Sequence, residues 1–157
     1  MWEAAATGLR SPSRRLIVIR IGIVLAKKGG YLSETLKAMR TGVIPVFGKG
    51  SQYVSWVHPA DISGFIAYAL QKPSVTGTFN MTAPNPVTGK EMATALKEVT
   101  GSAAIIFNIP AMLLRFILGE MATMILEGQR VSSKKMEQAG YSFRFSDIKS
   151  ALTDLMK

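Results

Sequence analysis

The stretch Gly48–Asp61 reads GKGSQYVSWVHPAD, and we expect it to join two differently built parts of the chain. Its two glycines on either side of Lys49 are typical of a tight turn. The apolar run Ile44–Phe47 before this turn and the β-rich run Gln52–Val57 after it predict the two strands of a hairpin. Pro45 favours an edge position for the first of these strands.

A helix is predicted to begin where this stretch ends. His58 fits the N-cap position, Pro59 loses no helical hydrogen bond at the first position, and Asp61 can meet the free N–H groups of the first turn. Apolar residues recur at helical spacing as far as Gln71, and Pro73 ends the helix. Capping therefore accounts for His58 and Asp61 without catalysis, although a histidine could also act as an acid–base group.

Upstream of this stretch, Leu16–Leu25 (LIVIRIGIVL) is a nearly continuous β-branched run. Such runs are typical of strands buried on both faces of a parallel sheet. Few other segments could flank this strand, and Trp2–Ala6 reads as the last turns of a helix that has no start. Both observations predict a piece of a larger α/β protein. Gly22 inside the run either admits a ligand or another backbone, or packs against a helix.

Downstream, short alternating elements predict a small α+β region. A helix over 89–100 has Thr88 and Glu91 as a capping box and Gly101 after its end. The remaining predicted strands are 78–81, 104–107 and 143–145, and the remaining predicted helices are 31–40, 110–118, 120–127, 133–139 and 147–156, the last capped by Ser146. The apolar stretch Ala103–Leu126 is interrupted by polar residues, so we expect two short helices and no membrane span.

The 157 residues carry a formal net charge of +9 and include no cysteine. The lack of cysteine excludes disulfides and thiolate metal sites, and it suits a reducing, cytoplasmic compartment. The basic residues are dispersed, so solvated faces explain them better than a nucleic-acid surface, and no nucleic-acid-binding motif accompanies them. A phosphate-bearing small-molecule substrate would also suit the excess charge.

Several catalytic and cofactor patterns can be tested and rejected. Lys49 lacks the flanking residues of a phosphate loop, and Tyr53 replaces the third glycine of a dinucleotide fingerprint. Tyr68 and Lys72 have the spacing of a dehydrogenase pair, but Pro73 follows Lys72 directly and no fingerprint precedes it. A single histidine excludes a His-rich metal site and, without a positioned nucleophile, a Ser-His-Asp arrangement. The residues therefore predict neither a catalytic nor a metal site.

Six segments in order resemble one family. They are RIGIVL (20–25), WVHPAD (56–61), GTFNMTAPNP (77–86), GEMA (119–122), EGQRV (127–131) and KMEQAGY (135–141). Over nearly the whole chain they are similar to the C-terminal half of an NAD-dependent epimerase/dehydratase family protein. The resemblance is to extended short-chain dehydrogenases, in the sugar-nucleotide-epimerase-like branch that has a C-terminal domain of unknown function.

This resemblance implies an α/β fold that combines the late parallel strands of a Rossmann domain with a small α+β substrate domain. Residues 1–29 and 54–82 would be the tail of the Rossmann domain, and 30–53 and 83–157 would form the substrate-side domain. The family's glycine loop and catalytic Tyr/Lys pair would lie before Met1. We therefore expect NAD(P) to bind the complete family protein and not this chain alone, whose partner would be the missing Rossmann half.

The resemblance also implies a cleft for a nucleotide-sugar-like or other small molecule. Six residues match the family segments that lead into or border this cleft: Arg20, Gly22, Gln52, Ser55, Trp56 and His58. Residue chemistry alone leaves Trp56 open between stacking on a substrate ring and filling the core.

A second hypothesis is a non-enzymatic interaction module that docks through the apolar helices of residues 103–126. It predicts an oligomer, such as a homo-oligomer, whose amount grows with concentration and which Leu114→Asp abolishes. Nucleic-acid binding is a weaker third hypothesis, which predicts a steep dependence of affinity on salt.

Overall fold

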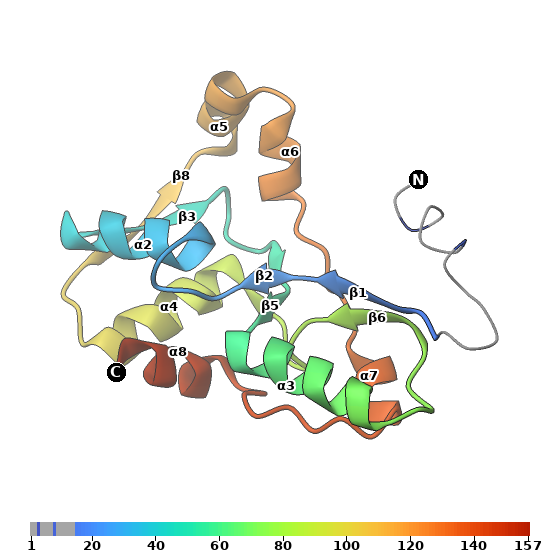
Figure 1. The fold of residues 1–157 in the computed structure, drawn as a ribbon. Coiled ribbons are helices and arrows are strands. Elements are labelled where there is room, and N and C mark those ends of the chain that lie inside the picture. Colours follow the sequence, from blue (N-terminus) through green and yellow to red (C-terminus); the bar gives the residue numbers. More distant parts are fainter. Residues whose placement is uncertain (1–2, 4–7, 9–14) are drawn as a thin grey trace.

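The computed structural model describes residues 3, 8 and 15–157 (Figure 1). Apart from Glu3, the helix predicted at Trp2–Ala6 lies outside these residues. The described part is a mixed α/β structure in which three of four strand pairs are parallel. The prediction of an α/β fold with parallel strands is therefore confirmed.

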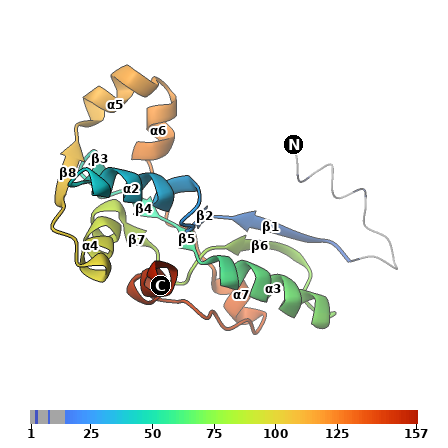
Figure 2. The ribbon, with the colours of Figure 1, turned by 60° about the vertical axis from the view of Figure 1, so that its left-hand side comes forward.

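The first pair of parallel strands forms one end of the molecule. Strand β1 (Ile17–Ile21) lies beside β6 (Gly77–Met81). Helix α3 (Pro59–Gln71) and the short helix α7 (Lys134–Gln138) lie near this pair in both ribbon views (Figures 1 and 2). Phe65, Phe79 and Met136 are buried together between these elements. This burial stabilises the end of the sheet from which the chain continues toward the candidate site.

A second parallel pair lies at the other end. Strand β3 (Val43–Phe47) pairs with β8 (Ile105–Ile109), and both α2 (Gly30–Arg40) and α4 (Gly89–Thr100) pack on β3. Helix α8 (Ile148–Met156) packs on α4. Ile44 and Val46 point into the core with Ala93, which places the helices on one face of this sheet.

Short strands connect the two ends. Strand β2 (Ile23–Val24) pairs in parallel with β5 (Trp56–Val57), and β4 (Tyr53–Val54) pairs antiparallel with β7 (Val87–Thr88). Leu25 and Trp56 are fully buried among side chains of α2, α4 and α8. One core therefore spans residues from both halves of the chain.

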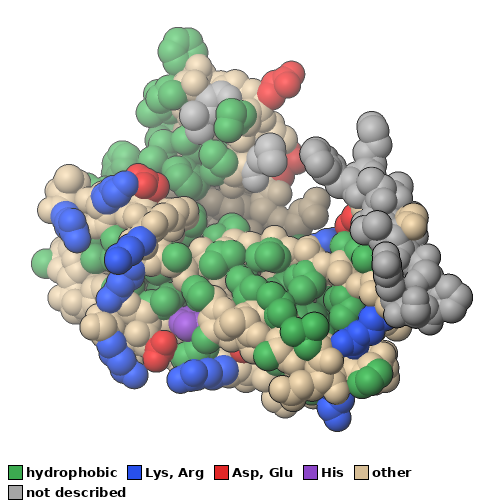
Figure 3. Space-filling model, in the orientation of Figure 1, with side chains coloured by type: hydrophobic (Ala, Val, Ile, Leu, Met, Phe, Trp, Pro, Cys, Tyr) green, Lys and Arg blue, Asp and Glu red, His purple; other side chains and the backbone are tan. Residues whose placement is uncertain are grey.

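Helices α5 (Ala111–Leu118) and α6 (Met121–Leu126) form a lobe that projects from the body (Figures 1 and 2). Hydrophobic side chains gather on this lobe in the space-filling view (Figure 3). Phe116 is 89% exposed, whereas Leu114 is only 6% exposed. Leu114→Asp would thus disturb folding rather than a surface, and Phe116 is the better position for testing the surface. Among the described residues, no helix is long and apolar enough to cross a membrane.

The predicted hairpin is wrong. The turn after Phe47 exists, but β3 pairs with β8, and the predicted strand Gln52–Val57 is divided at Ser55 into β4 and β5, which pair with β7 and β2. A glycine turn reverses the chain without deciding which strands pair. The observed partners lie far apart in the sequence, and local turn chemistry does not reveal them.

Three further predictions need correction. Residues 143–145 form no strand, because their backbone N–H groups bond to a side chain of α3 instead of a neighbouring strand. The cap of α8 is Asp147 and not Ser146, since the Asp147 carboxylate accepts from the Ser150 N–H. Leu16–Leu25 is not buried on both faces, since Ile21 is 53% exposed.

The predicted caps of α3 and α4 at His58, Thr88 and Gly101 are confirmed. The His58 Nδ1 atom accepts from the Ala60 N–H at the start of α3. Thr88 and Glu91 form the reciprocal bonds of a capping box, and Gly101 ends α4 in the left-handed conformation. These signals were readable because they depend on residues within one turn of each other.

Candidate functional site

At Gly22 the chain changes its strand partner from β6 to β5, and the candidate site lies at this change. β1 runs beside β6 up to Gly22, whose N–H donates to the Met81 carbonyl. The next residue, Ile23, donates instead to the Ser55 carbonyl at the start of β5. A side chain at Gly22 would overlap that carbonyl and lie 2.7 Å from the Thr82 Cγ2 atom. Gly22 thus admits another backbone, which is one of its two predicted roles.

A cavity of about 290 Å³ lies beside this change of strand partner. It is lined by Arg20, Ile21, Gly22, Asn80, Thr82, Gln129 and Val131. The Arg20 guanidinium forms a bidentate ion pair with Glu3, with Nε–Oε1 and Nη2–Oε2 distances of 2.6 and 2.7 Å. This hydrogen bonding lowers the pKa of Glu3 and raises the pKa of Arg20. Arg20 is exposed, so an anionic ligand can compete with Glu3 for it.

A second cavity of about 290 Å³ lies on the other side of the same segments. Its lining is mostly apolar and aromatic: Ile23, Tyr31, Val46, Phe47, Gln52, Tyr53, Val54, Gly89, Ile125 and Gly128. The Gln52 amide is held by donating to the Phe47 carbonyl at 3.1 Å. Burial raises the pKa of Tyr31, so its phenol stays neutral. An apolar lining with few oriented polar groups is typical of small-molecule sites.

The segment 127–131 separates the two cavities. Gly128 faces one cavity, while Gln129 and Val131 face the other. Ser55 anchors the segment, because its hydroxyl donates to the Gln129 carbonyl at 2.6 Å and accepts from the Val131 N–H at 3.0 Å. Gly128 must be glycine, since a Cβ atom there would overlap the Tyr53 backbone. Ser55 therefore holds in place the segment that forms a wall of both cavities.

Trp56 and His58 lie in the core behind the cavities. Trp56 is fully buried, and its indole N–H donates to the Asn85 carbonyl at 3.1 Å. His58 is 4% exposed and stacks on Phe145 at a centroid distance of 3.9 Å. Within the part of the chain that the structure describes, its Nε2 atom has no hydrogen-bond partner, and it lies 3.6 Å from the Asp154 carboxylate. Burial lowers the pKa of His58, and the nearby Asp154 opposes this effect only in part.

Sequence reasoning missed the most connected buried carboxylate, which is Asp61. It is completely buried and accepts from the Tyr141 hydroxyl and from the N–H groups of Arg144 and Phe145, at 3.2, 2.7 and 3.1 Å. Burial and this carboxylate raise the pKa of Tyr141 far above its usual range. In the sequence, the position of Asp61 in the first turn of a helix was sufficient to explain it as a capping residue. No sequence signal linked it to a loop some 80 residues away.

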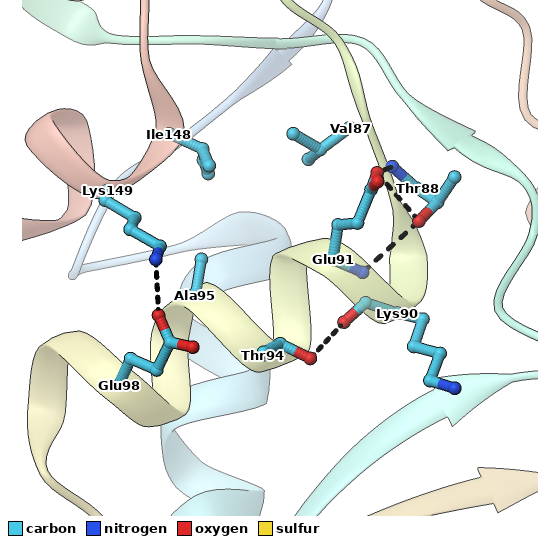
Figure 4. Close-up of a pocket in the computed structure, with 9 residues that line it drawn as sticks. All are labelled: Val87, Thr88, Lys90, Glu91, Thr94, Ala95, Glu98, Ile148 and Lys149. Carbon is cyan, nitrogen blue, oxygen red and sulfur yellow. Dashed lines mark hydrogen bonds and ion pairs between the residues drawn. The ribbon is translucent and has the colours of Figure 1, made fainter.

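A larger cavity, of about 520 Å³, lies apart from the six predicted residues, in a groove between α4 and α8 (Figure 4). Two of its charged side chains are already paired with neighbours. Glu91 bonds to Thr88, and Lys149 lies 2.6 Å from Glu98. Such a groove offers few free groups for recognition, so we place the candidate site at the two smaller cavities. Among the residues described, no group of three metal-binding side chains occurs.

Comparison with known proteins shows what this chain is similar to. Residues 109–155 match the family described as "Domain of unknown function (DUF1731)". The mouse epimerase family protein SDR39U1 is 38% identical over 156 residues, which are 99% of this chain and 53% of that protein. Over nearly its whole length, this chain is thus similar to about half of an epimerase family protein. It spans about half the length of the curated relatives that it matches.

Solved structures of the epimerase family share the fold. The human SDR39U1 structure, described as containing NADPH, superposes with a TM-score of 0.86 at 33% identity and covers 98% of this chain and 52% of that one. A nucleoside-diphosphate sugar epimerase from Corynebacterium glutamicum superposes with a TM-score of 0.72 at 26% identity, over 98% of this chain and 29% of that one. The fold is thus that of Rossmann-type extended epimerases, as the sequence resemblance implied.

Proposed function

We propose that this chain is the substrate-side part of an NAD(P)-dependent epimerase, dehydratase or reductase-like protein and is not catalytic by itself. The supporting observation is the pair of cavities where the parallel strands β1 and β6 end. Ligands of open α/β sheets bind at the carboxyl ends of the strands. The partner of the chain would be a nucleotide-binding Rossmann half, together with which it closes a cleft in the cytoplasm.

The six residues implied by the resemblance take different parts in this proposal. Arg20, Gly22 and Gln52 line the cavities and would face the substrate. Ser55 would hold the wall between the cavities, and Trp56 and His58 would support that wall from the core. The aromatic cavity suits a ring, and the exposed Arg20 suits a negatively charged group. A nucleotide-sugar-like or other phosphate-bearing small molecule combines both features.

Neither of these two cavities fits a complete dinucleotide. Each cavity is small, at about 290 Å³, and the turn around Lys49 joins two strands instead of a strand and a helix. A phosphate-binding glycine loop requires the latter arrangement, with the helix N-terminus facing the pyrophosphate. The cofactor would therefore be held by the other half of the protein.

Calorimetry can test whether the other half binds the cofactor and this chain contributes to substrate binding. Titration of NADPH into the chain alone should give no binding heat. Titration into a mixture with the other half of the human relative should restore binding if the halves associate. Arg20→Ala should leave the cofactor affinity of the mixture unchanged and weaken binding of a nucleotide sugar. Micromolar binding of NADPH to the chain alone would contradict the proposal.

A second candidate function is an interaction module that docks through α5 and α6, and the exposure of the lobe favours it. Its exposed large side chains are Met112, Leu113, Phe116, Ile117 and Met121. Docking onto the same lobe of another copy would bury these side chains. Phe116→Asp should then abolish an oligomer detected by sedimentation, whereas a monomer at all concentrations would count against this candidate.

A further inference from the structure

Strand β8 has an unprotected edge. In the part of the chain that the structure describes, β8 pairs with β3 and with no other strand. Ile105 donates to the Gly42 carbonyl, and the Ile109 carbonyl accepts from Gly48, so these residues point their backbone groups toward β3. Backbone groups alternate along a strand. Those of Ile106 and Asn108 therefore point to the free edge, which lies at the margin of the molecule (Figure 2).

The side chains of β8 do not protect this edge. Proteins usually protect edge strands with charged residues, proline or bulges. The sequence of β8 is IIFNI, which contains none of these. Ile105 is 70% exposed and Phe107 is 55% exposed, whereas Ile106 packs toward the core around Ile44. The strand thus offers both unpaired backbone groups and an apolar face.

We propose that the β8 edge binds the β8 edge of a second copy of this chain in an antiparallel, two-fold symmetric pair. A two-fold axis at Phe107 would place Ile105 opposite Ile109 of the second copy. It would also place Ile106 opposite Asn108. Because Ile106 and Asn108 carry the outward backbone groups, this register forms four hydrogen bonds between the strands. Within the five residues of β8, axes at neighbouring residues form fewer. The two Phe107 rings would meet at the axis, where opposite side chains come closest.

Charge favours a second copy at this edge. The chain carries a net charge of +9, so contacts between most other faces of two copies bring like charges together. Residues 101–114 contain no charged side chain, and β8 lies at the centre of this segment. Two five-residue strands bury less than the roughly 1,600 Å² of a standard interface. We therefore expect a reversible dimer with a dissociation constant on the order of tens of micromolar. This inference does not depend on the substrate-side function.

Sedimentation of the full chain over a range from about 1 to 300 μM tests the inference, since this range brackets the expected dissociation constant. Asn108→Pro removes one outward N–H from each copy without removing a bond to β3, and it should weaken the dimer at least tenfold. Asn108→Ala is the matched control. Both substitutions lose the bond from the Asn108 side chain to the Gly48 carbonyl, but alanine keeps the backbone N–H. The alanine variant should dimerise like the parent.

Two surface variants and amide exchange locate the contact. Phe107→Lys should abolish the dimer by placing two charges at the axis, while Phe116→Lys on α5 should leave it intact. Hydrogen exchange at the Ile106 and Asn108 amides should slow as the dimer forms. Circular dichroism verifies folding, and Phe107→Lys decides the matter if the proline variant unfolds. A monomer throughout, or a dimer that responds only to Phe116→Lys, would overturn the inference.

Discussion

Replacing Asp61 by Asn should loosen the loop 140–147 from helix α3. The two carboxylate oxygens accept from the N–H groups of Arg144 and Phe145 and from the Tyr141 hydroxyl, all within 3.2 Å. Asparagine has the same shape, but one of its terminal atoms is a donor. Whichever way the amide turns, its NH₂ group meets the N–H of Arg144 or Phe145 at a side-chain position that is completely buried.

The cost follows from these contacts. One charge-assisted hydrogen bond is worth about 1.5–3 kcal/mol, and a buried donor left without an acceptor costs about 1–3 kcal/mol. The free energy of unfolding should therefore fall by roughly 3–5 kcal/mol, which is a large part of the ~5–15 kcal/mol of an ordinary domain. Tyr141→Phe removes one hydroxyl bond and should cost only about 1 kcal/mol.

Urea unfolding at neutral pH measures these differences. Hydrogen exchange should in addition show faster exchange at the amides of Arg144 and Phe145 in the Asp61→Asn variant. Asp147→Ala provides a control on the same segment, because it removes a carboxylate that only caps α8 and should cost about 1 kcal/mol. A loss below 1 kcal/mol for Asp61→Asn would refute the assignment of Asp61 as the anchor of this loop.

Three further predictions concern single residues. Gly22→Ala should lower the free energy of unfolding by about 1–3 kcal/mol through overlap with the Ser55 carbonyl. Gly89→Ala should cost less, because the added atom meets only the end of the Gln52 side chain, at 3.1 Å; equal urea midpoints would contradict this. Burial lowers the pKa of His58, so the folded state favours the neutral imidazole, and the free energy of unfolding should drop as pH falls from about 7.5 to 5.5. His58→Asn keeps a capping acceptor and should make this drop smaller in urea titrations at the two pH values. An unchanged drop would exclude His58 as its cause. Thr88→Ala should cost about 1 kcal/mol by removing the capping box of α4, and thermal melting that matches the parent protein would argue against it.

Local signals carried most of what could be predicted. The His58 and Thr88 caps, the glycine after α4 and the apolar β1 run depend on residues within a few positions of each other, so their chemistry is visible in the sequence. The family resemblance extended this to the fold class, because its segments occur in order along nearly the whole chain. Neither source of information contains the distances between segments.

The strand pairing and the hydrogen bonds of Ser55 and Asp61 depend on distances between segments that are far apart in the sequence. The hairpin prediction failed because β3 found its partner in β8, about 60 residues later, where α4 covers the pair. Ser55 was expected to border a cleft, but whether it would face the ligand or the wall could not be read from its neighbours. The structure turns its hydroxyl toward the backbone of Gln129 and Val131.

The stretch Gly48–Asp61 shows the division clearly. By itself, the sequence determined that a turn precedes a β-rich run and that a capped helix begins at Pro59, since backbone preferences and capping act over a single turn. Only the tertiary structure decided that this run is divided between two pairings, that Gly22 makes room for it, and that Asp61 fastens a distant loop. These outcomes follow from packing and from satisfying buried polar groups, which involve atoms that are neighbours only after the chain has folded.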